Sequence, residues 1–201
     1  GKKYIRLVPG VVADRVIAAD GYGALVAFDR FSGKPLWQQQ FAAVERPGFG
    51  IKRLLDRRDP AFVSGGVGVG EGLVLIGTTQ GEVIALDAAD GSERWRTRVG
   101  TEVGAAPTAG NGRVYVQTID DRISALDADT GDVAWTYDSQ MPLLTLRGTS
   151  APVFDQGVLY SGFANGKVVA LRAENGEPIW EQRVMLPEGR SELDRIVDVD
   201  A

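Results

Sequence analysis

The sequence contains neither histidine nor cysteine in its 201 residues. Without histidine there is no imidazole base and no Ser-His pair. Without cysteine there are no disulfides, no Cys-His pairs and almost none of the usual zinc or iron sites. Any catalysis would therefore have to use Asp, Glu, Lys or Tyr side chains. The lack of cysteine does not identify the redox compartment, since it suits a reduced cytosol and equally an exported protein that avoids stray disulfides.

The chain also lacks a surplus of basic residues and a long apolar run. It has 22 Lys and Arg against 27 Asp and Glu, a net charge of -5, which argues against general nucleic-acid binding because that needs cations to replace phosphate counterions. No apolar run approaches the roughly 18 residues of a membrane span, and the opening Gly1-Lys2-Lys3-Tyr4-Ile5 is not a signal peptide. With 44% hydrophobic and 24% charged residues, the composition is that of a globular domain. The abrupt start indicates a piece of a longer chain without its targeting segment.

A repeated motif is the main signal in the sequence. Four segments align without gaps, and in each of them a Gly follows an Ala by six residues and a Trp follows it by ten. The glycines of the motif are Gly33, Gly91, Gly131 and Gly176. The tryptophans, which are all four in the chain, are Trp37, Trp95, Trp135 and Trp180. Self-similarity of this kind indicates a repeat architecture.

Each repeat has the features of four short strands. Segments such as Val114-Tyr115-Val116-Gln117 are rich in β-branched and aromatic residues, and polar turns such as Thr79-Gln80-Gly81 connect them to a second apolar run, as in a hairpin. In the Asp-x-x-x-Gly segment, Asp can accept hydrogen bonds from backbone amides while Gly takes a positive φ. A strand before each hairpin, such as one containing Ala106-Pro107-Thr108, and one carrying each Trp complete a four-stranded meander. That unit is one propeller blade.

The spacing of the tryptophans predicts the domain organisation. Successive tryptophans are 58, 40 and 45 residues apart, against a blade period of about 40 to 45 residues. Because a blade cannot bury both faces alone, each Trp is expected to pack between neighbouring blades. We therefore predict an all-β fold, a β-propeller of four-stranded antiparallel blades. The predicted blades cover 11–41, 65–100, 105–138 and 150–184, with an insertion over 42–63 and the start of a further blade at 191–201.

The motif resembles the pyrroloquinoline-quinone-type propeller repeat, and two further segments resemble loops of the BamB family of outer-membrane assembly propellers. These segments are 142–152 and 191–200. The resemblance implies an eight-bladed ring of which this chain holds about four blades, and a non-catalytic scaffold without a cofactor. It also implies attachment to the periplasmic face of the outer membrane through a lipid-bearing Cys that this chain lacks. An open arc leaves sheet faces and edges uncovered, so we expect the chain to dimerise, to bind another chain or to be less stable than its parent.

The resemblance also implies a partner-binding surface. In the family, the matching residues bind BamA through its periplasmic POTRA domains, and unfolded outer-membrane proteins are further candidate partners. Both loops follow the last strand of a blade, so they should emerge on the same face of the propeller. The expected partner-binding residues are Leu144, Leu146, Arg147, Asp198 and Asp200. The alternative is that the leucines fill a gap between blades while Arg147 pairs with one of the two aspartates inside the protein.

A different class of function shares the blade motif. Quinoprotein dehydrogenases, which use bound quinone and calcium, resemble this chain in the repeat, but many carry a pair of adjacent cysteines that is missing here. The acidic stretch Asp127–Asp132 is not followed by the Glu that a calcium loop requires, so the other repeats favour a blade hairpin. The insertion carries five cations between Arg46 and Arg58; a partner or anionic lipid headgroups could bind there, and a solvated surface loop is the alternative.

Overall fold

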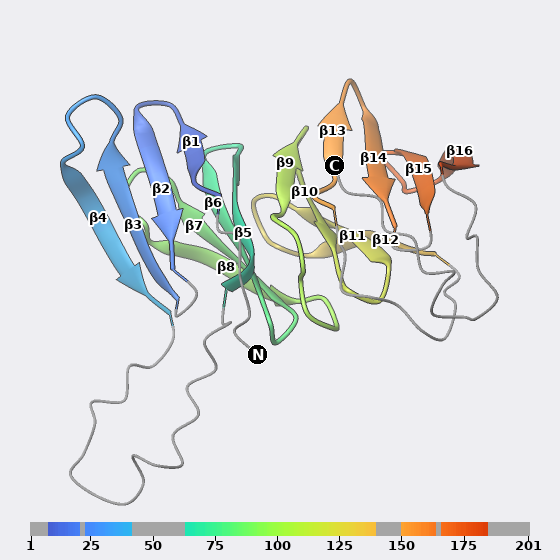
Figure 1. Ribbon diagram of the computed structural model, residues 1–201, viewed down its shortest axis with the longest axis horizontal. Coiled ribbons are helices and arrows are strands. Elements are labelled where there is room, and N and C mark those ends of the chain that lie inside the picture. The colour runs from blue at the N-terminus through green and yellow to red at the C-terminus, as the bar shows by residue number, and fades with distance from the viewer. Residues whose placement is uncertain (1–7, 21–22, 42–62, 140–149, 164–165, 185–201) are drawn as a thin grey trace, which may run out of the picture.

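The chain folds into four sheets that stand side by side in sequence order. The computed structural model describes residues 8–20, 23–41, 63–139, 150–163 and 166–184. In these residues, strands and turns form four antiparallel sheets of four strands each, arranged as an arc (Figure 1). The predicted all-β fold class is therefore confirmed. No helix in the described part of the chain is long and apolar enough to cross a membrane.

Each sheet is a meander in which consecutive strands are neighbours, and we call the sheets blades 1 to 4 in chain order. Blades 1 and 2 consist of β1 (Gly10–Val12), β2 (Arg15–Ala19), β3 (Ala24–Asp29), β4 (Pro35–Gln40), β5 (Val63–Gly70), β6 (Leu73–Thr78), β7 (Glu82–Asp87) and β8 (Glu93–Arg98). Blades 3 and 4 consist of β9 (Thr108–Gly110), β10 (Arg113–Gln117), β11 (Arg122–Asp127), β12 (Val133–Asp138), β13 (Val153–Asp155), β14 (Val158–Gly162), β15 (Lys167–Arg172) and β16 (Pro178–Arg183).

The second and third strands of blades 2 and 3 are largely apolar because a neighbouring blade covers each of their faces. Successive side chains of a strand point to opposite faces of the sheet. In β7, Val83 and Ala85 pack into the core shared with blade 3, whereas Ile84 and Leu86 pack into the core shared with blade 1. Three such cores lie between blades 1 and 2, 2 and 3, and 3 and 4. A strand that is buried on both faces requires a continuous hydrophobic run, and the central strands have one.

The turn between the third and fourth strands of a blade is built locally by the repeat. In blade 1, Asp29 Oδ1 accepts hydrogen bonds from the backbone N–H groups of Phe31 (3.2 Å) and Ser32 (2.6 Å). Hydrogen bonds from the Ser32 side chain and backbone hold the pKa of Asp29 below its ordinary value. Gly33 closes the turn with a φ of +67°, and its N–H donates to Asp29 O at 2.9 Å. The register of the third and fourth strands shifts at the same place in all four blades.

The first strands of blades 3 and 4 begin later than their sequence suggests. A strand containing Ala106-Pro107-Thr108 was expected, but β9 begins at Thr108, and β13 begins at Val153 directly after Pro152. Proline has no N–H to donate to a sheet ladder, so it is placed before the pairing starts.

Candidate functional site

The connections between blades leave from equivalent positions on one side of the arc. The residue that follows the last strand of each blade donates its N–H to a carbonyl in the turn between the second and third strands of the same blade. The four bonds are Phe41 to Gly23 (2.9 Å), Val99 to Gly81 (2.8 Å), Ser139 to Asp121 (3.3 Å) and Val184 to Gly166 (2.9 Å). Because the bond repeats, the connections all start at the side opposite to the Asp-x-x-x-Gly turns.

The residues predicted to bind a partner lie outside the described residues. Leu144, Leu146 and Arg147 belong to 140–149, and Asp198 and Asp200 belong to 185–201. Ser139 and Ser150, which flank the first of these segments, are among the described residues. The Oγ of Ser150 donates to Gly162 O at 3.3 Å and accepts from Gly162 N–H at 3.2 Å, and Ser139 and Ser150 are both buried. The two predicted loops therefore start from the same side of blades 3 and 4, which are adjacent.

The connection between β8 and β9 shows how a short connection packs. Val103 forms an isolated bridge with Thr118, and its N–H donates to Thr78 O at 3.1 Å. Its carbonyl accepts from Ser64 Oγ at 2.6 Å. The Val103 side chain is fully buried in the core between blades 2 and 3. Val99, at the start of the same connection, belongs to the same core, so two apolar side chains fill the gap between blades here.

The repeated tryptophans lie between blades wherever the structure has a following blade. Each indole N–H donates to a backbone carbonyl in the Asp-x-x-x-Gly turn of the next blade. The bonds are Trp37 to Ala88 (3.2 Å), Trp95 to Ala128 (2.8 Å) and Trp135 to Ala173 (3.0 Å). The ring also covers the turn glycine, since a Cβ at Gly91, Gly131 or Gly176 would lie 2.6, 2.7 or 2.5 Å from it. Trp180 and Gly33 are at the two ends of the arc and have no such counterpart in the described residues.

A polar cluster joins blades 3 and 4. The Nζ of Lys167 lies 2.8 Å from Glu181 Oε2 and 3.1 Å from the hydroxyl of Tyr137, and this hydroxyl donates to Glu181. Burial raises the pKa of Tyr137. Burial alone would lower the pKa of Lys167, but its hydrogen bonds to Glu181 and Tyr137 shift it upward overall. The hydrogen bond from Lys167 is the main reason that the pKa of Glu181 is lowered. No sequence pattern pointed to this cluster, because its members come from two blades.

The cluster predicts a pH dependence of stability on the acid side. Because the pKa of Glu181 is lowered in the folded protein, its contribution is present above the unfolded pKa and is lost as the pH falls through the folded pKa. Glu181→Gln should remove that part of the pH dependence. We expect an effect below about 1 kcal/mol, since the carboxylate is partly exposed. Urea midpoints measured from about pH 7 to pH 3 would show it.

The control for this experiment is Glu177→Gln, which changes an exposed carboxylate 4.0 Å from Arg172 on a turn of the same blade. It should leave the acid-side dependence unchanged. Identical curves for the Glu181 and Glu177 variants would show that the cluster does not contribute.

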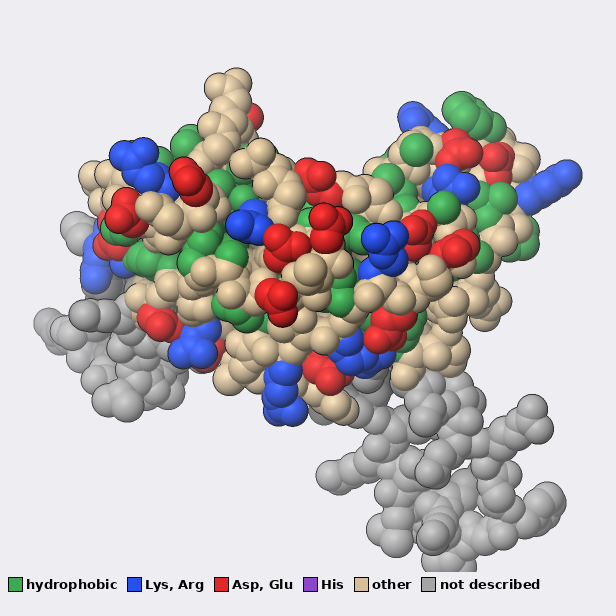
Figure 2. All heavy atoms as spheres, turned by 180° about the vertical axis from the view of Figure 1, so that it is seen from behind, with side chains coloured by type: hydrophobic (Ala, Val, Ile, Leu, Met, Phe, Trp, Pro, Cys, Tyr) green, Lys and Arg blue, Asp and Glu red, His purple; other side chains and the backbone are tan. Residues whose placement is uncertain are grey.

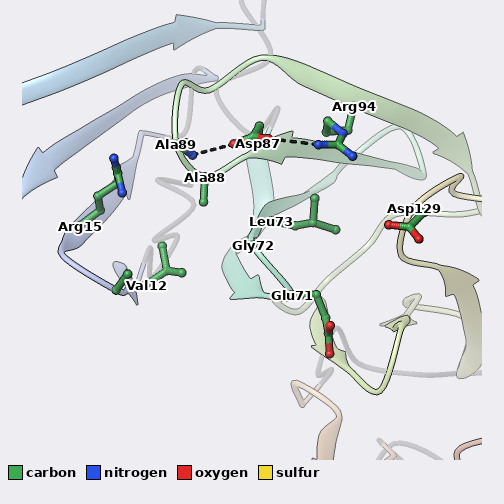
Figure 3. A pocket seen from close by; sticks show the side chains of 11 residues that line it. Val12, Arg15, Glu71, Gly72, Leu73, Asp87, Ala88, Ala89, Arg94 and Asp129 are labelled. Atoms are coloured by element: carbon green, nitrogen blue, oxygen red, sulfur yellow. Dashed lines mark hydrogen bonds and ion pairs between the residues drawn. The ribbon is translucent and has the colours of Figure 1, made fainter.

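A cavity of about 360 Å³ opens on the side of the Asp-x-x-x-Gly turns. Its lining includes Arg15, Glu71, Asp87, Arg94 and Asp129 (Figure 3). Asp87 accepts hydrogen bonds from Ala89 N–H (2.8 Å) and from Arg94 (3.1 Å), so its carboxylate is used within its own turn. Acidic and basic side chains are interspersed in the view of Figure 2. Within the described ranges, no group of three or more Asp or Glu side chains comes together to hold a metal ion.

The four meander sheets, the repeated turn and the Trp-Gly contacts define a β-propeller segment built from pyrroloquinoline-quinone-like repeats. A family model described as outer membrane protein assembly factor BamB matches residues 52–201. The chain belongs to the BamB family, which confirms the resemblance found in the sequence.

Relatives named as outer membrane protein assembly factor BamB align along nearly the whole chain. The relative from Shewanella oneidensis is 36% identical over 200 residues, which is 100% of this chain and 49% of the relative. The relative from Xanthomonas campestris pv. campestris is 42% identical over 196 residues, which is 98% of this chain and 46% of the relative. The chain thus spans about half the length of the curated relatives it matches.

Solved structures show the same fold. The crystal structure of BamB from Moraxella catarrhalis superposes with a TM-score of 0.80 at 29% identity, covering 96% of this chain and 54% of that chain. A quinohemoprotein alcohol dehydrogenase from Pseudomonas putida superposes with a TM-score of 0.67 at 19% identity, covering 90% of this chain and 34% of that chain. At that identity, the likeness to the dehydrogenase shows a shared fold and nothing about function.

Proposed function

We propose that this chain is part of a non-catalytic scaffold of the outer-membrane β-barrel protein assembly (BAM) machinery. Its membership of the BamB family carries the proposal, because the matching relatives are named as assembly factors. The scaffold works at the periplasmic face of the bacterial outer membrane, as part of a longer, lipid-anchored protein. The proposed partner is BamA, bound through its POTRA domains. Unfolded outer-membrane proteins are proposed as clients that pair with exposed strand edges.

The surplus of apolar residues in 140–149 supports a partner-binding role for this connection. Val103 lies eight residues after Trp95 and fills the gap between blades 2 and 3. Counted in the same way from Trp135, Leu143 takes that position. Two apolar side chains, Val99 and Val103, fill the gap at the shorter connection. The longer one contains Leu144, Leu146 and Met141 besides Leu143, which is more than that gap requires. Exposed apolar side chains beside a charged one are typical of protein-binding sites.

The common origin of the two loops supports a composite surface. Ser139 and Val184 occupy equivalent positions in adjacent blades, and the loops containing Leu146 and Asp198 start from them. Arg147 beside Asp198 and Asp200 would provide charges of both signs at the rim of the apolar residues. An internal contact between Arg147 and one aspartate is compatible with binding, since it would shape the loop that the partner contacts.

Substitutions in the first loop should test the proposed interface. We expect Leu146→Ala and Arg147→Ala each to weaken the affinity for the BamA POTRA domains by about 10- to 30-fold, because truncation of a central interface side chain costs roughly 2 kcal/mol. Co-purification followed by a binding titration with isolated POTRA domains measures the change.

Two variants of the same residue types serve as controls. Val133→Ala removes an exposed apolar side chain from the outer strand of blade 3, and Arg172→Ala removes an exposed cation on the side of the Asp-x-x-x-Gly turns. Both should bind like the unmodified chain. If Leu146→Ala and Arg147→Ala bind normally while the protein stays folded, the interface assignment is wrong.

A further inference from the structure

The cavity on the side of the Asp-x-x-x-Gly turns lies over blade 2, between the first hairpin of blade 1 and the turn of blade 3 that carries Asp129. Its volume of about 360 Å³ is at the small end of the range of about 300 to 1,000 Å³ that is usual for ligand sites. The connections between blades start on the opposite side of the arc. A ligand in this cavity would therefore use a surface that the proposed function does not.

The floor of the cavity is apolar. Val12 of blade 1 and Leu73 and Ala88 of blade 2 contribute to it, and Figure 3 shows Leu73 in the middle of the lining residues. Leu73 is 6% exposed and belongs to the core between blades 2 and 3, so the floor is held in place by that core. An aliphatic chain that lies on this floor would gain hydrophobic contact.

Blade 2 has a leucine where blades 1 and 3 have an arginine. In each blade, the first residue of the second strand lies opposite the last residue of the third strand, and in blade 3 these residues are Arg113 and Asp127. Arg113 Nη1 lies 2.7 Å from Asp127 Oδ2, so the arginine side chain occupies this place. The corresponding residues of blade 2 are Leu73 and Asp87. The space that an arginine takes up in blade 3 is therefore open in blade 2.

The cations of the lining are already paired, whereas two of its carboxylates are not. Arg15 and Arg94 each form an ion pair with a carboxylate, with N–O distances of 2.7 and 3.1 Å. Within the described residues, the carboxylates of Glu71 and Asp129 neither accept a hydrogen bond nor form an ion pair. The cavity thus combines an apolar floor with two carboxylates that are available to a positively charged group.

Glu71 occupies a backbone conformation that glutamate rarely adopts. It is the first residue of the turn between β5 and β6 and has a φ of +53°. Asn111 takes the same place in blade 3 with a φ of +55°, and asparagine is, after glycine, among the residues that adopt this conformation most readily. The turn by itself therefore does not favour glutamate, which is consistent with a role for its carboxylate outside the turn.

The charges of the lining differ between its two sides. Arg15 belongs to blade 1 and Asp129 to blade 3, so they lie on opposite sides of the floor on blade 2 (Figure 3). A ligand with a cation at each end would place one of them near Arg15. A lysine or arginine side chain of a polypeptide has only one cation, at the end of an apolar stem. The backbone carbonyls beside it can accept hydrogen bonds from an arginine.

We propose that this cavity binds a lysine or arginine side chain of a partner polypeptide. The aliphatic stem lies on Leu73 and Val12, and the cationic group pairs with Glu71 and Asp129. Two carboxylates beside an apolar floor select such a side chain over an acidic or a purely apolar one, because charge complementarity contributes specificity. The site gives the propeller a second interaction surface, which does not depend on the proposed BamA-binding residues.

Short capped peptides test the proposal. The probe is acetyl-alanyl-lysyl-alanine amide, titrated into the isotopically labelled chain while the amide resonances are followed by NMR. We expect saturable shifts at Leu73, Ala88 and Ala89. The same peptide with norleucine in place of lysine has the apolar stem without the charge, and it should bind about 5-fold more weakly, the effect of losing two exposed ion pairs. Added salt should reduce this difference.

Glu71→Asn separates binding from folding. This variant copies Asn111 of blade 3, so its thermal stability should be unchanged or higher, while the lysine peptide should bind about 2- to 5-fold more weakly. Asp129→Asn should weaken binding by a similar factor. Glu174→Gln is the matched control, because Glu174 is exposed and takes the place of Asp129 in the turn of blade 4, away from the cavity. This variant should bind the peptide like the unmodified chain.

Four results would overturn the proposal. The first is the absence of saturable shifts at the cavity. The second is equal affinity for the norleucine peptide, which would show that the carboxylates do not contribute. Equal weakening by Glu174→Gln would show a general attraction to acidic side chains. Cadaverine, a free diamine, should bind more weakly than the lysine peptide, and equal binding would indicate a site for small amines instead of a polypeptide.

Discussion

Gly131→Ala is expected to lower the free energy of unfolding by about 2 to 5 kcal/mol, the sum of backbone strain at a positive φ and overpacking against a buried ring. Gly131 has a φ of +77°, and a Cβ there would lie 2.7 Å from the ring of Trp95. The indole cannot move aside easily, because its N–H is bound to Ala128 O and the ring is buried. Urea denaturation followed by tryptophan fluorescence or circular dichroism measures the loss.

The control separates the two contributions. Gly112 has a φ of +69° with nothing within 4 Å of its Cβ, so Gly112→Ala should cost only the backbone strain of about 1 to 2 kcal/mol. In a chain that already carries Trp95→Ala, Gly131→Ala should cost less than in the unmodified chain, because only Thr97 Oγ1, also 2.7 Å from the Cβ position, still crowds it. Equal losses for Gly131→Ala and Gly112→Ala in the unmodified chain would contradict a role for the Trp-Gly contact.

Trp95→Ala is expected to lower the free energy of unfolding by about 3 to 5 kcal/mol, as is typical for removal of a buried aromatic side chain. The substitution empties the centre of the core between blades 2 and 3 and leaves the Ala128 carbonyl without its donor. A domain of this kind is stabilised by only about 5 to 15 kcal/mol in total. The substitution should therefore remove a large fraction of the free energy of unfolding. Thermal and urea unfolding, at concentrations where the chain is monomeric, measure the effect.

Trp180→Ala is the matched comparison for this prediction. Trp180 occupies the same motif position but is 42% exposed, so its loss from a single chain should cost clearly less than the loss of Trp95. Comparing the two variants distinguishes a stabilising effect of the motif itself from an effect of the contact with a neighbouring blade. Equal destabilisation by the two substitutions would show that the contact with a following blade is not the source of the stability.

The sequence by itself determined the blade as a local unit. The Asp-x-x-x-Gly turn depends on contacts within five residues, such as Asp29 with Ser32, and on the positive φ at Gly33. The side chains of a strand such as β7 point alternately to the two faces of the sheet because of the backbone geometry of the strand. The hairpin turns likewise follow from residues close together in the chain. The repetition of this unit then indicated the fold class, because identical sheets with two apolar faces bury these faces by stacking.

The partner-binding loops could not be derived in the same way. The connections differ in length from blade to blade, so the repeat does not predict their conformation, and Leu144, Leu146, Arg147, Asp198 and Asp200 were expected from a family resemblance. They lie outside the described residues and remain a proposal.

Only the tertiary structure decided which copies of the motif make the blade contact. Trp95 and Trp180 are indistinguishable in the pattern, yet one is buried and the other is half exposed, because burial depends on a following blade and not on the motif. The same holds for Gly131 and Gly33. The cluster of Lys167, Glu181 and Tyr137 also depends on packing, since Lys167 and Glu181 pair within blade 4 but Tyr137 joins them from blade 3 only when the two blades stack. Contacts within a blade follow from local sequence, whereas contacts between blades depend on which surfaces the stacking brings together.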